Sequence, residues 1–263
     1  MESITSKNND KIKFAVSLRD SASQRKKNGM FFVEGARLCE DAALSDGDIL
    51  QFFFTEKAKI KFPEFYDNIS LKAKEIYCIS EDVSRKLSDT QSPQGIFCIC
   101  RSSDNTGMNK INPEGKYVLL ENVQDPSNLG AIARTAEAMG IDGLIVNGGC
   151  DIYNPKALRA CMGAFFRLNV IICDEILPFI ESAKEMGMCV LASTPDADAV
   201  KINGVDFSGG VICIVGNEGN GITVQTMNAA TSKVTIPMRG RAESLNASTA
   251  AAILIWEMVR HGS

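Results

Sequence analysis

Residues 216–252 carry three features that together decide the fold of the C-terminal half. A glycine-rich turn comes first, and a short apolar segment that leaves a predicted strand follows it. A polar turn then begins an alanine-rich helix. They read Gly216-Asn217-Glu218-Gly219-Asn220-Gly221, Ile236-Pro237-Met238 and Glu243-Ser244-Leu245-Asn246-Ala247-Ser248. Few folds need all three so close together. Turns of this kind sit where ligands bind when they follow the strands of a parallel sheet.

The sequence around these turns alternates between apolar runs typical of buried strands and helical patterns. Alternation of this kind predicts an α/β fold, with a mostly parallel sheet and helices on both of its faces. The predicted strands cover 117–121, 144–147, 170–173, 189–193, 211–215 and 233–236. The predicted helices cover 128–139, 154–164, 174–186, 223–230 and 246–260.

A polar, turn-rich stretch near residue 105 divides the chain. Before it we expect short buried strands at 31–33, 50–54 and 95–100, with helices near 11–20, 35–44 and 81–87. The predicted domains are a small N-terminal α/β domain, a linker and a C-terminal domain, covering residues 1–104, 105–115 and 116–263.

The composition of the chain indicates where the protein is located and which kinds of site it contains. No apolar run approaches the roughly 18 residues of a membrane span, and the N-terminus lacks the apolar segment of a secretory signal, so we expect a cytoplasmic protein. Cys98 and Cys100 would share one face of a strand, but no histidine accompanies them, so no metal site is expected. The one histidine, His261, stands near the C-terminus, which argues against a Ser-His-Asp triad.

The net charge of −4 does not suggest a nucleic-acid partner, because phosphate binding usually leaves a basic footprint. Any affinity for RNA must therefore come from local basic patches, and each patch is explained about as well by an ordinary solvated surface. The candidate RNA-binding residues are Arg19, Arg25, Lys26, Lys27, Arg239 and Arg241.

Each motif alone has a structural explanation. The order Gly-x-x-Gly-x-Gly after the 211–215 strand differs from the dinucleotide-binding Gly-x-Gly-x-x-Gly, which disfavours a nucleotide-dependent oxidoreductase. Asn128, Ser244 or Asn246 would serve as helix caps, and Glu218 as a turn-forming carboxylate at a helix start. Arg134 would be an exposed arginine.

In combination with Asn128 and Arg134 of the segment 125–135, the three features resemble the motifs of the SpoU/TrmH-type (SPOUT) RNA ribose 2′-O-methyltransferases across 116–263. The segments 31–35 and 92–96 look like the substrate-binding domain that precedes the catalytic domain in many ribosomal RNA members. The resemblance implies a C-terminal trefoil knot, a homodimer, S-adenosylmethionine as cofactor and no metal.

The resemblance also implies roles for individual residues. S-adenosylmethionine would contact Thr194, Gly216, Ile236, Leu245 and Asn246, with glycine at 216 leaving space for the cofactor. Catalysis would involve Arg134, Asn128, Glu218, Ser244 and Asn246. Arg134 is cast in the family as a general base, but a guanidinium does not deprotonate in proteins, so we favour a clamp on the phosphate and the developing alkoxide. Asn128 would orient Arg134, Glu218 would brace it or the ribose, and Ser244 and Asn246 would position the 2′-hydroxyl and the cofactor.

The substrate implied by the N-terminal domain is ribosomal RNA. The alternatives are the same fold acting on transfer RNA, a non-catalytic RNA-binding module, and a related enzyme that methylates a base. The chemical identity of the methylated product separates base methylation from ribose methylation.

Overall fold

The structure, a computed structural model, describes residues 2–45, 47–102, 108–196 and 198–260. Contacts divide the chain into two compact units: Met1–Asp104 with Tyr153–Phe166, and Asn105–Ile152 with Arg167–Ser263. The predicted domain boundaries follow chain order and stay a prediction. His261 and linker residues 105–107 lie outside the described residues. No helix in the described ranges is long and apolar enough to cross a membrane.

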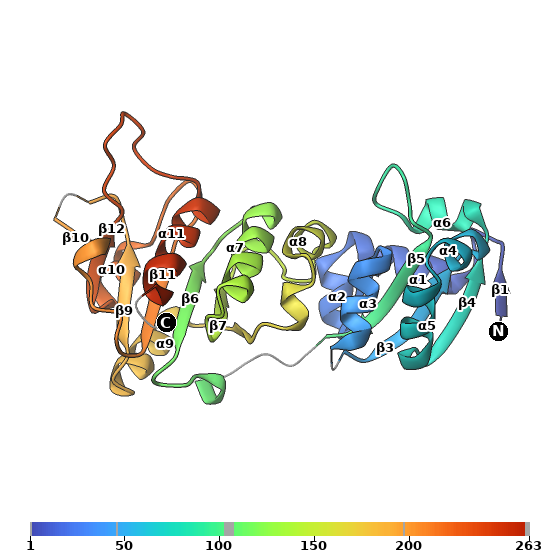
Figure 1. Cartoon of the computed structure of the whole chain (residues 1–263), viewed down its shortest axis with the longest axis horizontal. Helices are drawn as coiled ribbons and strands as arrows, with labels where there is room; N and C mark the ends of the chain where they lie inside the picture. Colours follow the sequence, from blue (N-terminus) through green and yellow to red (C-terminus); the bar gives the residue numbers. More distant parts are fainter. Residues whose placement is uncertain (1, 46, 103–107, 197, 261–263) are drawn as a thin grey trace. The chain divides into compact units, whose positions relative to one another are not determined.

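The first unit contains a five-stranded mixed sheet in the order β1-β4-β3-β5-β2 (Figure 1). The strands are β1 (Glu2–Ile4), β2 (Met30–Glu34), β3 (Ile49–Phe54), β4 (Glu75–Ile79) and β5 (Ile96–Arg101). The helices are α1 (Asp10–Asp20), α2 (Ala22–Asn28), α3 (Ala36–Leu44), α4 (Glu56–Lys61), α5 (Pro63–Lys72), α6 (Glu81–Leu87) and α8 (Pro155–Cys161), with a 3-10 turn η2 at Ala164–Phe166.

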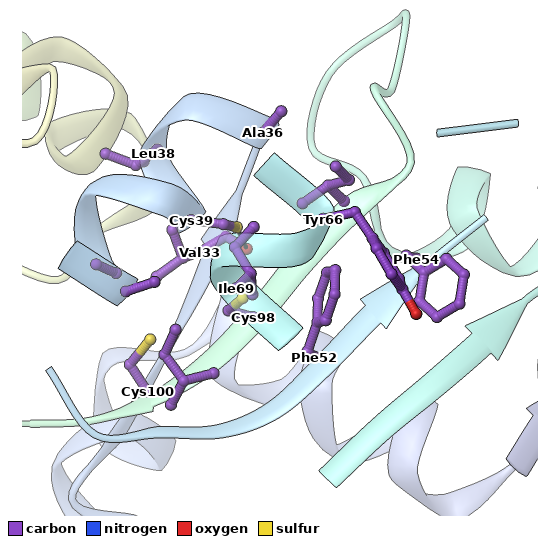
Figure 2. Close-up of a cluster of buried hydrophobic side chains, with 14 of the residues drawn as sticks. Val33, Ala36, Leu38, Cys39, Phe52, Phe54, Tyr66, Ile69, Cys98 and Cys100 are labelled. Carbon is purple, nitrogen blue, oxygen red and sulfur yellow. Dashed lines mark hydrogen bonds between the residues drawn. The ribbon is translucent and has the colours of Figure 1, made fainter. Parts of the chain in front are cut away.

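Alternation along the strands of the first unit builds a core on each face of the sheet. Phe52 and Phe54 pack with residues of α3 and α5, as Figure 2 shows, whereas Phe53 joins α1 and α6 on the other face. Successive side chains of a strand point to opposite faces, so one apolar run supplies both cores. Cys98 and Cys100 lie on the same face, as predicted.

The second unit contains a seven-stranded sheet in the order β10-β12-β9-β11-β6-β7-β8, in which every pair of neighbours is parallel. The strands are β6 (Lys116–Glu121), β7 (Gly143–Asn147), β8 (Val170–Ile172), β9 (Cys189–Ser193), β10 (Val200–Lys201), β11 (Val211–Val215) and β12 (Ser232–Thr235). The helices are α7 (Pro126–Ala138), α9 (Ile176–Glu185), α10 (Val224–Ala229) and α11 (Ala247–Val259), with short turns η1 (Met108–Lys110) and η3 (Ile202–Gly204).

Helices cover both faces of the parallel sheet. The helices α7 and α11 pack against each other, and α11 also contacts β6 and β11, while α9 and α10 pack together on the core formed by Phe179, Ile180 and Ile214. The central strand β11 is buried along its whole length, as its unbroken apolar run predicts. The predicted α/β fold is therefore confirmed. The predicted knot concerns how the chain end is threaded and stays a prediction.

Candidate active site

All seven strands of the second sheet run parallel, so their carboxyl ends lie at one edge, which is where ligands bind in such folds. Thr194 follows β9, Gly216 follows β11 and Ile236 follows β12, and the order β12-β9-β11 makes these strands neighbours. The Thr194 amide donates to the carbonyl of Val234 at 2.9 Å, which continues the pairing of β9 with β12 past the end of the strand. Three predicted cofactor contacts thus lie at the same edge.

The glycine-rich turn after β11 closes on itself. Asn217 and Gly221 exchange two backbone hydrogen bonds of 3.0 and 2.9 Å, and the Asn217 side chain accepts from the amides of Gly219 and Asn220. A Cβ added to Gly216 would lie 2.2 Å from the carbonyl carbon of Gly221. The turn itself therefore requires glycine at 216, and the expected space for the cofactor stays a prediction.

Glu218 projects from this turn to the start of α7. Its carboxylate accepts hydrogen bonds of 3.0 Å from the amides of Gln124 and Asp125 and from Nδ2 of Asn128. Partial burial opposes ionisation, but the hydrogen bonds from Asn128 and the two amides outweigh it and lower the pKa of Glu218 to about 2. Glu218 therefore stays ionised at neutral pH and joins the second motif to the first.

Asn128 and Asn246 complete a line of hydrogen bonds across all three motifs. Asn128 is buried, and its Oδ1 accepts from Nδ2 of Asn246 at 3.0 Å while its own Nδ2 serves Glu218. The cap of α7 is Asp125 rather than Asn128. Asn246 does cap α11, because its Oδ1 accepts from the amides of Ser248 and Thr249. Asn246 thus has both the structural role and a place in the site.

Arg134 and Ser244 do not take part in this line of hydrogen bonds. Arg134 is exposed on α7, six residues after Asn128, and a helix turns about 100° per residue, so the two side chains lie about 120° apart around the helix axis and point to different faces. Arg134 makes no hydrogen bond or ion pair with the described residues, so the expected contacts with Asn128 and Glu218 are absent within one chain. Ser244 is exposed and its side chain has no hydrogen bond to that same part of the chain.

Glu121 is a site residue that our sequence reasoning missed. It is buried at the end of β6 and accepts from the amide and hydroxyl of Thr223, at 3.1 and 2.8 Å, and from the hydroxyl of Thr226 at 2.9 Å. These bonds tie the end of the glycine-rich turn to the neighbouring strand. The available signal was an acidic residue at the end of an otherwise apolar run.

The predicted RNA-binding residues divide into two groups. Arg25 is buried and donates to the carbonyls of Leu18 and Arg19, while Arg19 donates to the last carbonyls of α6. Both guanidinium groups donate to carbonyl oxygens at the ends of helices, so we withdraw Arg19 and Arg25 as RNA contacts. Lys26, Lys27, Arg239 and Arg241 are exposed and remain candidates.

The segment between β12 and α11 fits a ligand held by backbone groups. No backbone-to-backbone hydrogen bond within the described ranges involves residues 236–245, which leaves their amides and carbonyls available. Ile236 and Leu245, at the two ends of the segment, are half-buried apolar side chains. Free peptide groups beside apolar side chains suit the heterocycle and aliphatic chain of S-adenosylmethionine.

Comparisons with known proteins agree with this geometry. Residues 115–256 match the SpoU rRNA Methylase family, and residues 9–98 match the MRM3-like substrate binding domain. The chain belongs to the SpoU rRNA methylase family. The recognition of the family and of a methyltransferase in the sequence is therefore confirmed, together with the substrate-binding character of the N-terminal part.

Three relatives illustrate the similarity of this SpoU family member to known proteins. The 23S rRNA (guanosine(2553)-2′-O)-methyltransferase RlmP of Bacillus subtilis is 30% identical over 98% of this chain and 99% of its own. The 23S rRNA (uridine(2479)-2′-O)-methyltransferase of Streptomyces viridochromogenes is 34% identical over 64% of this chain and 60% of its own. The AdoMet-bound rRNA methyltransferase of Sinorhizobium meliloti superposes with a TM-score of 0.88 at 28% identity, covering 99% of this chain and 98% of that one.

Proposed function

We propose that this SpoU family member transfers the methyl group of S-adenosylmethionine to a ribose 2′-hydroxyl of ribosomal RNA. The observation that carries the proposal is the line of hydrogen bonds from Asn246 through Asn128 to Glu218, which joins three separate motifs at the ligand-binding edge of a parallel sheet. The names of the Bacillus and Streptomyces relatives support ribosomal RNA over transfer RNA, and the AdoMet-bound Sinorhizobium structure supports the cofactor.

The residues of the site divide into those that hold the cofactor and those that position the RNA. S-adenosylmethionine, when bound, supplies a methyl group activated by the sulfonium. Thr194, Gly216 and the backbone of 236–245 hold it, with Ile236 and Leu245 as apolar walls. The fixed Asn246 side chain and exposed Ser244 position the 2′-hydroxyl, and Glu218 keeps the turn and α7 in register.

Arg134 is proposed to bind the RNA rather than to accept its proton. A guanidinium stays protonated in proteins and offers five N–H donors, so it suits the phosphate and the developing negative charge on the 2′-oxygen. Its exposure and its lack of partners among the described residues leave those donors available. Because it points to a different face of α7 from Asn128, a second copy of the chain offers a route by which Arg134 reaches a complete site.

The remaining features follow from the same proposal. We infer a homodimer through α7 and α11, where Met139, the C-cap of α7, and Trp256 of α11 expose 41% and 53% of their surface. We also infer that the C-terminal segment is knotted, and that domains 1–104 and 116–263, joined by the linker 105–115, bind RNA and catalyse transfer. Ribosomes are assembled in the bacterial cytoplasm, which supports a cytoplasmic location.

The test is methyl transfer to RNA from cells that lack the gene. The purified protein is incubated with radiolabelled S-adenosylmethionine and total RNA, the RNA is separated by size, and the labelled nucleotide is identified. Label on large-subunit ribosomal RNA as a 2′-O-methylnucleoside supports the proposal. Label on transfer RNA or in a methylated base would contradict it. RNA binding without cofactor binding would indicate a non-catalytic RNA-binding module.

A further inference from the structure

A cavity of about 260 Å³ lies within the first unit, and none of the site residues described above lines it. Its lining includes Arg37, Leu38, Gln94, Arg159 and Met162, which come from α3, the loop before β5, and α8 with its C-terminal cap. Drug-sized ligands occupy pockets of roughly 300–1,000 Å³, so this cavity suits a single heterocyclic ring.

Hydrogen-bond donors in the cavity wall lack acceptors. Arg159 donates through Nη2 to Asp89 at 2.7 Å, but its Nη1 is buried without a hydrogen bond among the described residues, and it lies 3.8 Å from a carboxylate oxygen of Glu34, beyond hydrogen-bond distance. Gln94 uses Oε1 to accept from the Ala36 amide, which leaves its NH₂ group for a ligand. Arg37 is exposed and forms no ion pair with the described residues. A buried donor without an acceptor costs free energy, so this wall calls for an oxygen or nitrogen acceptor.

The wall is also held in place before any ligand arrives. Glu34 is buried and accepts from the Thr90 hydroxyl at 2.9 Å and the Asp89 amide at 3.0 Å, which fixes the loop that carries Asp89. Met162 has a left-handed backbone (φ 50°), unusual for a residue with a side chain, and is 45% exposed. Leu38 belongs to the core cluster drawn in Figure 2 and adds a second apolar surface.

The charges of the lining decide whether a phosphate or a base of the RNA would occupy the cavity. Two guanidinium groups, of Arg37 and Arg159, are balanced by two carboxylates, of Glu34 and Asp41. A phosphate would meet carboxylates as well as arginines, whereas a neutral ring with carbonyl oxygens satisfies the donors and packs on Met162 and Leu38. We propose that this cavity binds one unpaired, unstacked base of the RNA substrate. The proposal rests on the proposed function only in taking RNA as the substrate.

The test measures binding of host 23S rRNA transcript to the full chain by filter retention at several salt concentrations. The variants are Arg37→Ala and Met162→Gly, since glycine accepts the left-handed backbone and keeps the fold. Each is expected to weaken binding about ten-fold, within the range of a lost base contact, without changing the slope of affinity against salt. Arg85→Ala, an exposed arginine on α6 outside the cavity, is the matched control and is expected to bind as the parent does.

Several results would overturn the proposal. A salt slope reduced by about 0.7–0.9 in Arg37→Ala would identify a phosphate contact instead. Unchanged affinity in both variants, or a parent chain that does not retain the transcript, would remove the base site. Photo-crosslinking of transcript containing 4-thiouridine and 6-thioguanosine is expected to label peptides at 35–41 or 158–162. Because binding is measured without methyl transfer, a chain that binds through this cavity but does not methylate fails the proposed function alone.

Discussion

Glu218 is the residue whose hydrogen bonds hold the glycine-rich turn to the start of α7, and its ionisation makes that contact pH-dependent. Its pKa in the folded chain is about 2, below the ordinary 4.5, so its stabilisation is complete above about pH 4.5 and is lost as the pH falls toward 2. Glu218→Gln is expected to cost about 1 kcal/mol at pH 7, a low value for charged hydrogen bonds because the side chain is exposed. Urea unfolding followed by the fluorescence of Trp256 measures this, and a difference that persists undiminished at pH 3 would contradict the assignment.

Arg134 is the residue on which the chemistry is expected to depend most. Arg134→Ala is expected to lower kcat about 100-fold or more, because losing a donor that stabilises developing negative charge has an effect of this size. The affinity for S-adenosylmethionine should stay unchanged. Arg134→Lys should recover part of the rate, since a lysine keeps the charge but not the forked geometry. Single-turnover transfer and cofactor calorimetry test this, and full activity in Arg134→Ala would exclude the residue from the mechanism.

Site residues differed in how far the sequence could place them. Thr194, Gly216 and Ile236 came together as expected because each directly follows a strand of a parallel sheet. Arg25 was misassigned because a buried arginine that satisfies helix carbonyls has the same sequence signature as a surface one. Tertiary partners of this kind are set by packing between helices, which no local pattern contains.

At the scale of elements, the start of α11 combines a helix cap with a contact to α7, and two substitutions separate these roles. Asn246→Ala removes the acceptor for two amides and should destabilise the chain by about 1 kcal/mol. Asn246→Asp keeps the cap but loses the donor to Asn128, so it should retain stability and lower methyl transfer. Thermal unfolding and transfer rates measured on both variants check this. Equal activity in Asn246→Asp and the parent would show that Asn246 is only a cap.

The elements that the sequence predicted are the ones with strong local patterns. The strands β6, β9 and β11 are apolar runs buried on both faces, and their positions are confirmed to within about one residue. The strands β1, β4 and β10 were missed: β1 and β10 are three and two residues long and gain their order from pairing with β4 and β12, and β4 is only partly buried. Pairing across the sheet is a long-range property, so short edge strands leave little trace in the sequence.

For the whole molecule, the inferred homodimer predicts a linked loss of assembly and activity. Trp256→Glu places a charge on the exposed apolar surface of α11 and is expected to yield monomers, whereas Trp256→Phe should leave the dimer intact. If a second copy supplies Arg134, the monomer should still bind S-adenosylmethionine but transfer methyl groups at least ten-fold more slowly. Analytical ultracentrifugation and the transfer assay test this together, and a fully active monomer would contradict it.

The nine free cysteines can be used to follow the unfolding of each unit, because a buried thiol becomes reactive only when its unit unfolds. Burial raises the thiol pKa of Cys98 and Cys100 in the first unit and of Cys213 in the second, so none of them reacts readily with a thiol reagent while its unit is closed. Pulsed alkylation in increasing denaturant, read by peptide mass, would therefore time the exposure of each unit separately. Modification of Cys98 at a lower denaturant concentration than Cys213 would identify the first unit as the less stable one. Modification of both at the same concentration would show that the two units unfold together.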